Sequence, residues 1–354
     1  MTRLTDLYQR YRLRLKRRNF LLRALWARRG LRPLSDHTAR IARGDILLFA
    51  CLRNEGARLP FFLHHYRQLG VTHFLIVDND SGDDSAALLL DQPDVSLWHA
   101  VGSYRAARFG MDWLNGLLMR YGHGHWCLTV DADEILVLPS DAALPALTAW
   151  LDARGADHMA ALMLDLYPQG ALSTAHCAPG DDPAGVLGWY DAQGYDWEYK
   201  PRYRAISIRG GPRQRMFFDD HPDRAPHLHK TPLIRWHWRH AYVSSTHLAL
   251  PRRLNTGFDA RLNLPTGILL HNKFLDQIIP RSQDEHLRGE HFTHAERYDA
   301  YYDGLIADPV LWHPGAVRWR GWRAAQAEGL MTCGDWHTDA PDLDQSVDKT
   351  GITI

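Results

Sequence analysis

The sequence predicts an α/β protein with a mixed, mainly parallel sheet flanked by helices. From Asp45 onward, short apolar runs that suit buried strands alternate with amphipathic stretches that suit helices. Repeated strand–helix units form parallel sheets with right-handed crossovers. Polar clusters follow three predicted strands where each strand ends. Open α/β sheets bind their ligands at that edge, so we expect one ligand site there.

The first 44 residues differ from the rest in charge. Residues 1–44 carry 13 Lys and Arg but only two acidic residues, which leaves a net charge of −11 on the other 310 residues because the whole chain is neutral. Within residues 1–32, apolar side chains recur at mostly helical spacing and predict a basic amphipathic helix, through Leu4, Leu7, Tyr8, Tyr11, Leu15, Leu22, Leu25 and Trp26. Residues 32–36 are expected to form a linker after this helix.

The basic arm has two interpretations, which stay open at this point. It can lie on an anionic membrane surface, or it can pack on the body or on another subunit with its basic face in solvent. Nucleic acid is not expected as a partner, because the body is acidic. No run approaches 18 apolar residues, and the four scattered cysteines form no CxxC pair. We therefore expect a cytoplasmic protein, with peripheral binding to the inner membrane face if the arm meets lipid.

The first predicted strand is the continuous apolar run 46–51, which is typical of a strand buried on both faces. A turn at Asn54-Glu55-Gly56 separates it from a helix whose apolar stripe stops at Gly70. The same alternation predicts the next elements, namely strands at 74–77 and 95–98 and helices at 86–90 and 105–121.

A fourth buried strand is predicted at 126–130, and it ends in Asp131-Ala-Asp133-Glu134. The pattern after it is less regular. It predicts a helix at 145–151, an apolar strand at 159–168 that contains Asp165, a mobile loop at 173–198, short strands within 199–250, and a late strand at 267–274. The expected units are the arm 1–44, a body 45–280, and a C-terminal helical extension and tail 281–354.

The strand-end carboxylates point to a metal. Two carboxylates at positions i and i+2, such as Asp131 and Asp133, can hold Mg²⁺ or Mn²⁺ and leave coordination positions for phosphate oxygens. The alternative is a solvated acidic turn with no ligand. Asp78 and Asp80 could accept hydrogen bonds from a base or a ribose. The alternative is an Asx-turn or N-cap that uses Asp83 or Ser85, and both can hold because the two roles fall on different members of this segment.

Three segments carry a family resemblance. Cys51-Leu-Arg-Asn-Glu-Gly, Val77-Asp-Asn-Asp-Ser-Gly-Asp and Trp126-Cys-Leu-Thr-Val-Asp-Ala-Asp-Glu together resemble the family 2 glycosyltransferases. The sequence is most similar to a bacterial branch in which Lys-x-Pro-Leu-Ile-Arg-Trp and Leu-Leu-His follow. The resemblance covers about residues 45–280. It implies a GT-A fold, a nucleoside-diphosphate-sugar donor, a divalent metal and inversion at the anomeric carbon, with a nucleotide half at 45–138 and an acceptor half at 139–280.

The resemblance also implies roles for particular residues. Asn54 and Glu55 match the turn beside the nucleoside, and Asp78 matches the acid that reads the base. Asp131 and Asp133 match the pair that contacts ribose and metal, with Asp133 the direct metal ligand. The chain departs from the family in having Asp78-Asn-Asp-Ser where many members have Asp-Asp-Gly-Ser.

The catalytic base is a second departure, because no Glu-Asp pair follows the metal motif. Asp165 is the first candidate, since it ends the next strand on the expected side. Asp219 and Asp220 come second. A structural role in a cap or an ion pair is the alternative for Asp165.

Candidates in the later half come from residue type. His247 and His271 could serve as a late ligand for metal or diphosphate, although a lone histidine is more often structural. Five cations could neutralise a diphosphate: Arg213, Arg215, Lys230, Arg235 and Lys273.

The favoured function is thus a metal-dependent transferase that moves a sugar to a glycan or lipid-linked acceptor. One alternative is a nucleotidyltransferase acting on a sugar phosphate, but the turn after the first strand has one Gly where such enzymes carry a Gly-rich loop. The other is a non-catalytic, membrane-associated carbohydrate-binding protein, which the intact Asp131, Asp133 and Glu134 disfavour. The donor sugar, the acceptor and the linkage are not determined by the sequence.

Overall fold

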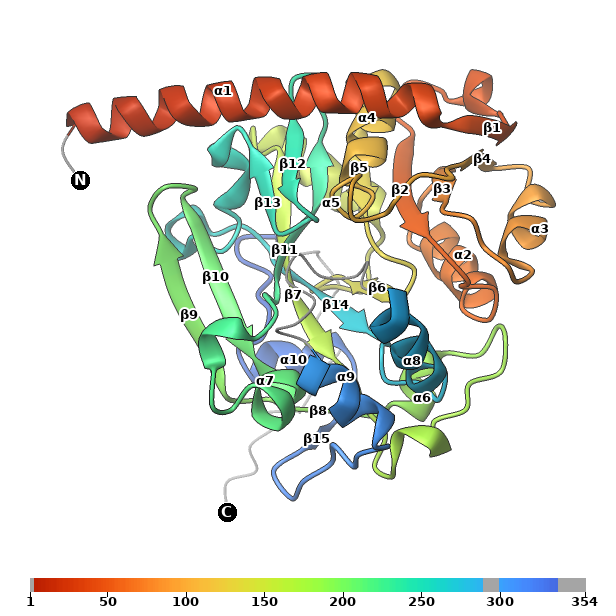
Figure 1. Ribbon diagram of the computed structural model, residues 1–354. Helices are drawn as coiled ribbons and strands as arrows, with labels where there is room; N and C mark the ends of the chain where they lie inside the picture. Colours follow the sequence, from red (N-terminus) through yellow and green to blue (C-terminus); the bar gives the residue numbers. More distant parts are fainter. Residues whose placement is uncertain (1–2, 289–298, 337–354) are drawn as a thin grey trace, which may run out of the picture.

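The computed structural model describes residues 3–288 and 299–336, and it is organised around a nine-stranded sheet (Figure 1). The spatial order of the strands is β1 (Arg32–Ser35), β4 (Val95–His99), β3 (His73–Asp78), β2 (Ile46–Leu52), β5 (Trp126–Thr129), β11 (His229–Arg235), β7 (His158–Asp165), β14 (Gly267–His271) and β6 (Glu134–Val137). Six of these strands point in one direction, while β1, β11 and β6 run antiparallel to their neighbours. The predicted mixed, mainly parallel α/β sheet is therefore confirmed.

Helices and small hairpins surround the sheet. Three two-stranded sheets pair β9 (Tyr195–Lys200) with β10 (Ala205–Gly210), β12 (Ala241–Ser244) with β13 (Leu248–Leu250), and β8 (Trp189–Tyr190) with β15 (Val317–Arg318). The helices are α1 (Arg3–Ala27), α2 (Leu59–Gln68), α3 (Ser85–Leu90), α4 (Met111–Tyr121), α5 (Leu144–Ala153), α6 (Pro183–Val186), α7 (Gly211–Phe217), α8 (Ile278–Arg288), α9 (Asp299–Ile306) and α10 (Trp322–Ala327). Within the described residues, no helix is long and apolar enough to cross a membrane.

Strand β2 is buried on both faces, and its seven residues divide between two cores. Leu48 and Ala50 belong to the core that includes α2 and α5, whereas Leu47 and Phe49 belong to the core that includes α4. Successive side chains of a strand point to opposite faces, so a strand covered by helices on both sides must be apolar throughout. This explains why its sequence shows no alternation.

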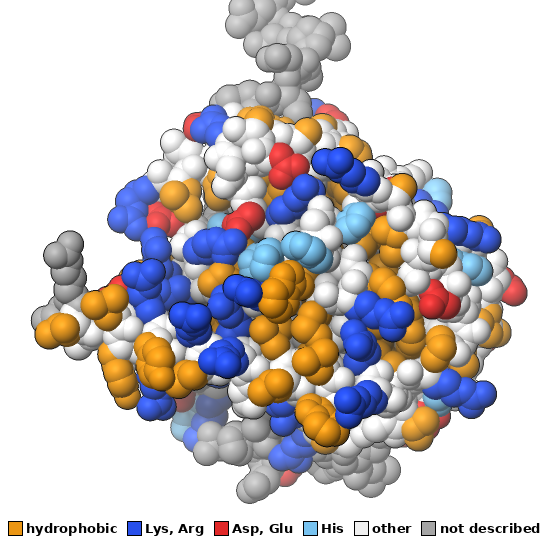
Figure 2. Space-filling view, turned by 90° about the horizontal axis from the view of Figure 1, so that it is seen from above, with side chains coloured by type: hydrophobic (Ala, Val, Ile, Leu, Met, Phe, Trp, Pro, Cys, Tyr) orange, Lys and Arg blue, Asp and Glu red, His pale blue; other side chains and the backbone are white. Residues whose placement is uncertain are grey.

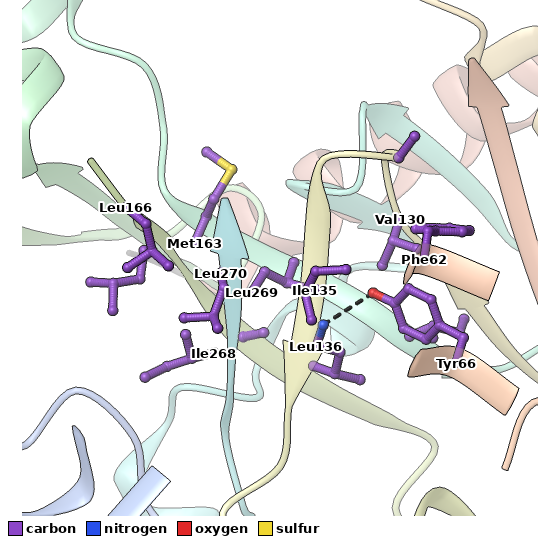
Figure 3. Close-up of a cluster of buried hydrophobic side chains, with 14 of the residues drawn as sticks. Phe62, Tyr66, Val130, Ile135, Leu136, Met163, Leu166, Ile268, Leu269 and Leu270 are labelled. Carbon is purple, nitrogen blue, oxygen red and sulfur yellow. Dashed lines mark hydrogen bonds between the residues drawn. The ribbon is translucent and has the colours of Figure 1, made fainter. Parts of the chain in front are cut away.

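Strand β6 is a short edge strand that the sequence pattern did not reveal. It begins at Glu134, the last residue of the acidic turn, so its short apolar run reads as a continuation of that turn. Tyr66 of α2 holds it in place. Its hydroxyl donates to the Glu134 carbonyl at 2.8 Å, and it accepts from the Leu136 amide at 3.0 Å, the bond drawn in Figure 3. The turn before β6 is thereby fixed from the core side.

Several predicted boundaries need correction. Residues 32–35 form the edge strand β1, paired with β4, and not a linker. The helix expected at 105–121 begins at Met111, because Arg108, Phe109 and Gly110 all have positive φ and break helical geometry. The loop expected at 173–198 contains α6, β8 and the start of β9, and the strand expected at 267–274 ends at His271.

The C-terminal elements pack into the same core as the sheet. Tyr301, Leu305 and Trp336 belong to the cluster that contains Leu48 and Ala50. The predicted boundary between 280 and 281 falls inside α8, so packing does not break there. The parts of the predicted extension at 289–298 and 337–354 lie outside the described residues.

Candidate functional site

A cavity of about 730 Å³ lies at the carboxyl ends of β2, β5 and β14. The turns after these strands line it, together with residues 223–227, the turn after β12 and the start of α8. It therefore occupies the edge of the sheet where the sequence predicts a ligand site. Nine of the predicted site residues line it: Asn54, Glu55, Asp131, Asp133, Arg213, Lys230, His247, His271 and Lys273.

The acidic turn, Asp131–Glu134, places its three carboxylates in different surroundings. The side chain of Asp131 is 44% exposed and that of Asp133 is 23% exposed, whereas that of Glu134 is 1% exposed. The Glu134 amide donates to the Asp131 carbonyl at 3.0 Å, which closes the turn. All three line the cavity, but Asp131 and Asp133 are open to it, whereas Glu134 is buried in its wall.

His271 lies beside the acidic turn because β14 pairs with β6 on one side and with β7 on the other. Its Nε2 is 3.2 Å from Asp133 Oδ2, and its Nδ1 is 2.5 Å from Asp165 Oδ1. Burial raises the pKa of Asp133, but the His271 imidazole outweighs burial and holds that pKa well below its usual range. Burial lowers the pKa of His271, and the two carboxylates outweigh it, so the net shift is upward.

Asp165 is not placed as a catalytic base. Its Oδ1 contacts His271, and its Oδ2 accepts from Arg213 Nε at 2.7 Å. The side chain is 1% exposed and does not line the cavity. A base must reach the proton that it removes, and both oxygens of Asp165 already have partners. The geometry gives it a positioning role, in which it fixes the ring of His271 and orients Nε2 toward Asp133.

Replacing Asp165 with Asn should destabilise the fold by about 3–5 kcal/mol, because it leaves Arg213 as a buried cation without its carboxylate. The free energy of unfolding in urea measures this. Asp152→Asn is the matched control: it loses an ion pair to Arg235 at 3.9 Å whose two side chains are 47% and 40% exposed. Its expected cost is below about 1 kcal/mol. Equal costs for the two variants would show that the Asp165 pairings contribute little.

Lys230 neutralises the acidic turn. Its ammonium lies 2.7 Å from Glu134 Oε1 and 3.4 Å from Asp131 Oδ2. Burial lowers the pKa of Lys230, but Glu134 and Asp131 outweigh burial and raise it. This cation lines the cavity and is already committed to carboxylates, so any diphosphate would share it with the turn.

Two other cations, Arg213 and Lys273, are less neutralised by carboxylates and are better placed to bind an anion. Arg213 is buried, lines the cavity, and has an Nη2 without a hydrogen-bond partner among the described residues. Burial and then the neighbouring Arg213 guanidinium lower the pKa of Lys273 to about 8. Within the described chain Lys273 forms no ion pair, and its ammonium lies 5.9 Å from the centre of the Tyr301 ring. An incoming anion would satisfy Arg213 Nη2 and raise the pKa of Lys273 back toward its ordinary value.

The turn after β2 is tied to the turn after β3. Asn54 has a positive φ of 54°; its amide donates to Ser81 Oγ at 2.9 Å, and its Oδ1 accepts from the Gly82 amide at 2.8 Å. Glu55 accepts from Arg58 at 2.8 Å and from Arg281 at 2.6 Å. Both residues line the cavity, with their side chains largely engaged in shaping it.

The structure separates Asp78 and Asp80 from the cavity lining. Asp78 is buried and accepts hydrogen bonds from the amide and hydroxyl of Ser81, as in a turn cap. Asp80 is 61% exposed, and its nearest ionic neighbour is His99 at 3.8 Å. The cavity is lined in this region by Asn79, whose side-chain amide donates to the Ala100 carbonyl at 2.8 Å.

Arg215 and Arg235 lie away from the cavity, which corrects their assignment to diphosphate binding. Arg215 pairs with Asp191 at 3.0 Å. Arg235 lies beside Trp126 at the start of β5, the opposite end of that strand from the acidic turn. The fifth late candidate, His247, does line the cavity, and its Nδ1 lies 2.7 Å from the His229 carbonyl, with no contact to Asp133 or His271 within the described chain.

Sequence reasoning missed other lining residues. Arg58 and Arg281 complete the wall around Glu55, and Arg281 is 226 residues from it in sequence. Asp223 and Asp284 are exposed carboxylates of the lining, whereas the second-choice bases Asp219 and Asp220 are exposed outside it. No local sequence signal marks these residues, because only the fold brings them to the cavity.

The side chains at this edge are of types that bind a divalent metal, but they do not form a complete coordination shell. Carboxylate and imidazole are ligands that Mn²⁺ accepts, and Asp133 and His271 bring one of each together on neighbouring strands. In the described part of the chain, no group of three or more His, Cys, Asp or Glu side chains is arranged to hold an ion. Oxygens from a bound ligand or water would therefore complete the coordination.

Comparisons with known proteins add little. No family model matches the chain, and no curated protein matches it. The crystal structure of 4-diphosphocytidyl-2C-methyl-D-erythritol synthase is similar at 18% sequence identity and a TM-score of 0.22, over 41% of this chain and 71% of that one. A similarity this low says nothing about the activity, which has to be inferred from the cavity.

Proposed function

We propose that this chain is a metal-dependent glycosyltransferase of the GT-A type that resembles family 2. It would move a sugar from a nucleoside diphosphate to a hydroxyl of a glycan or lipid-linked acceptor, with inversion. The observation that carries the proposal is the contact of Asp133 with His271 at the carboxyl edge of the sheet, beside Arg213 and Lys273. That edge offers donors for a divalent ion and cations for a diphosphate in one cavity.

Asp133 and His271 would hold Mn²⁺ or Mg²⁺, and Asp131 would add a carboxylate beside it or contact the ribose. The bound ion would supply Lewis-acid stabilisation of the charge on the diphosphate leaving group. Asp165 would keep the ring of His271 oriented, as carboxylates commonly do for metal-bound histidine. His247 has no contact that supports a role as a ligand.

The nucleotide would lie against the turns after β2 and β3. Asn54, Glu55 and Asn79 form that wall, and Asp78 would shape it from behind through Ser81. The diphosphate would meet Arg213 Nη2 and the Lys273 ammonium, because these cations face the cavity with the least neutralisation. A buried charge left without a partner is costly, which favours anion binding at this point.

The acceptor hydroxyl would attack the anomeric carbon as the bond from that carbon to the diphosphate oxygen breaks. Its proton would pass to a carboxylate of the cavity lining. Asp223 and Asp284 are the candidates, since both are exposed carboxylates that line the cavity. Either would replace Asp165 as the base.

A thermal-shift screen with Mn²⁺ and a panel of nucleoside-diphosphate sugars tests the proposal. A matching donor at 100 times its dissociation constant should raise the free energy of unfolding by about 2.7 kcal/mol. EDTA should remove most of this effect. Release of free nucleoside diphosphate from the same donor then measures turnover.

Three outcomes would contradict the proposal. Donor binding that is unchanged by EDTA would show that no divalent metal takes part in it. Release of pyrophosphate from a nucleoside triphosphate and a sugar phosphate would identify a nucleotidyltransferase. Glycan binding with no dependence on nucleotide would identify a carbohydrate-binding protein.

A further inference from the structure

Helix α1 has two apolar faces, and only one of them is packed. Leu13, Phe20 and Ala24 are buried where the helix lies on α4, β12 and β13 (Figure 1). The apolar residues that define the sequence pattern lie on the other side. At 100° per residue they fall within a stripe about 100° wide, opposite the buried face. This outer stripe consists of Leu4, Leu7, Tyr8, Tyr11, Leu15, Leu22, Leu25 and Trp26, whose exposures range from 40% to 78%.

The outer stripe is an unusual concentration of apolar surface. Of the 17 large hydrophobic side chains that the described residues expose, eight belong to it. Scattered apolar residues are normal on a protein surface, but eight on one face of a single helix, interrupted by Arg18 between Leu15 and Leu22, mark an interaction site. Since the body already covers the opposite face of α1, the fold itself does not use the outer stripe.

Basic side chains lie beside and between the apolar residues of the outer stripe, and Figure 2, which looks down on this face, shows Lys and Arg interspersed with them. Arg12 donates to the Tyr8 hydroxyl at 3.2 Å, and the Arg29 guanidinium lies 4.5 Å from the centre of the Trp26 ring. Asp6 is the one acidic residue of α1, and it is paired with Arg252. The face therefore combines apolar residues, interfacial Tyr and Trp, and a positive charge that nothing on the helix offsets.

We propose that the outer stripe of α1 docks on an anionic lipid bilayer. A helix that is apolar along one face and edged with Arg lies in the plane of a membrane, with its apolar side chains below the headgroups and its cations among the phosphates. A second copy of this chain is a poorer occupant, because its own arginines would face those of the first. The proposal does not depend on the proposed function.

The docked helix would hold the body in one orientation. Arg23 pairs with Asp112 of α4 at 2.7 Å, and Lys16 bonds to the Tyr203 hydroxyl at 3.0 Å, so α1 cannot move independently of these contacts. Strand β12, which α1 contacts, ends at Ser244 in the cavity lining. Bilayer and cavity would thus be linked through one short strand.

Co-sedimentation with phosphatidylcholine vesicles that contain about 30% phosphatidylglycerol tests the proposal. The full chain should bind these vesicles, bind pure phosphatidylcholine far less, and dissociate as salt is added. The double variant Leu4→Gln and Leu22→Gln should weaken binding at least about tenfold, because two leucines lose their burial. Deleting residues 1–32 is a poorer test, since it would also uncover the core around Leu13 and Phe20.

Matched controls separate the stripe from general effects. Leu90→Gln with Leu262→Gln alters two leucines that are each 44% exposed elsewhere and should bind like the wild type. Arg12→Gln with Arg29→Gln should weaken binding, whereas Arg318→Gln with Arg320→Gln should not. Equal binding by stripe and control variants would overturn the proposal. A second result would also overturn it: the wild-type chain binds no vesicles but forms a concentration-dependent dimer in analytical ultracentrifugation, and the stripe variant abolishes that dimer.

Discussion

Asp133→Asn is expected to reduce donor turnover by about 10³-fold, because a metal ligand supplies several kcal/mol of charge stabilisation in the transition state. The substitution keeps the size of the side chain and its reach toward His271. It removes the charge that would hold the cation beside Nε2. Affinity for Mn²⁺ in the presence of the nucleoside diphosphate, measured by electron paramagnetic resonance, should fall as well.

Asp80→Asn is the matched control for this result. It makes the same chemical change on another strand-end turn, where the side chain is exposed and outside the cavity lining. Turnover and Mn²⁺ affinity should stay near the wild-type values. If Asp133→Asn also retains both, the assignment of the metal to this turn is wrong, whatever the activity proves to be.

Acidification should destabilise this protein through histidines that are buried, as His229 and His240 are, or half-buried, as His227 is. Burial, with help from neighbouring cations, lowers the pKa of His227 to about 4 and those of His229 and His240 to about 3. In the unfolded chain these imidazoles take up protons near pH 6.5. Below that pH the unfolded chain binds more protons than the folded one, so stability is full above about pH 6.5 and falls as the pH drops toward 4.

Each such group contributes a slope of up to about 1.4 kcal/mol per pH unit between roughly pH 6 and 4.5, so together they are large against an ordinary folding stability. His271 acts in the opposite sense, since its pKa is raised by Asp133 and Asp165 despite burial. Urea unfolding at a series of pH values measures the slope. His227→Gln should reduce it by about 1.4 kcal/mol per pH unit, and the exposed His64→Gln should leave it unchanged. A stability that does not change between pH 7 and 5 would contradict this account.

The sheet could be predicted because its information is local. Strands such as β2 and β3 are continuous apolar runs, and the helices between them carry clear apolar stripes. Chain direction then follows from the handedness of the crossovers. The edge strand β1 escaped prediction because it is mostly exposed and contains Pro33, and β6 because it begins within the acidic turn at Glu134.

In the candidate site, too, some features follow from local sequence and others only from the fold. The sequence identified the acidic turn and His271 by residue type and position. It cannot assign partners, so it leaves Asp165 open between a catalytic base and a structural ion pair; the structure shows the carboxylate paired with His271 and Arg213. Arg215 and Arg235 were indistinguishable from Arg213 in sequence, and only the packing of α7 and the direction of β11 separate them.

The sequence by itself determined the α/β sheet, the carboxylates at its edge and the basic, amphipathic character of α1. Those properties depend on side-chain type and on periods of two or 3.6 residues, which neighbouring positions encode. The tertiary structure decided which of these groups meet. Asp133 reaches His271 because β6 and β14 pair in one register, and the outer stripe of α1 is exposed because Leu13, Phe20 and Ala24 occupy the packed face. Register and packing are set by contacts between residues far apart in the chain, and no local pattern records them.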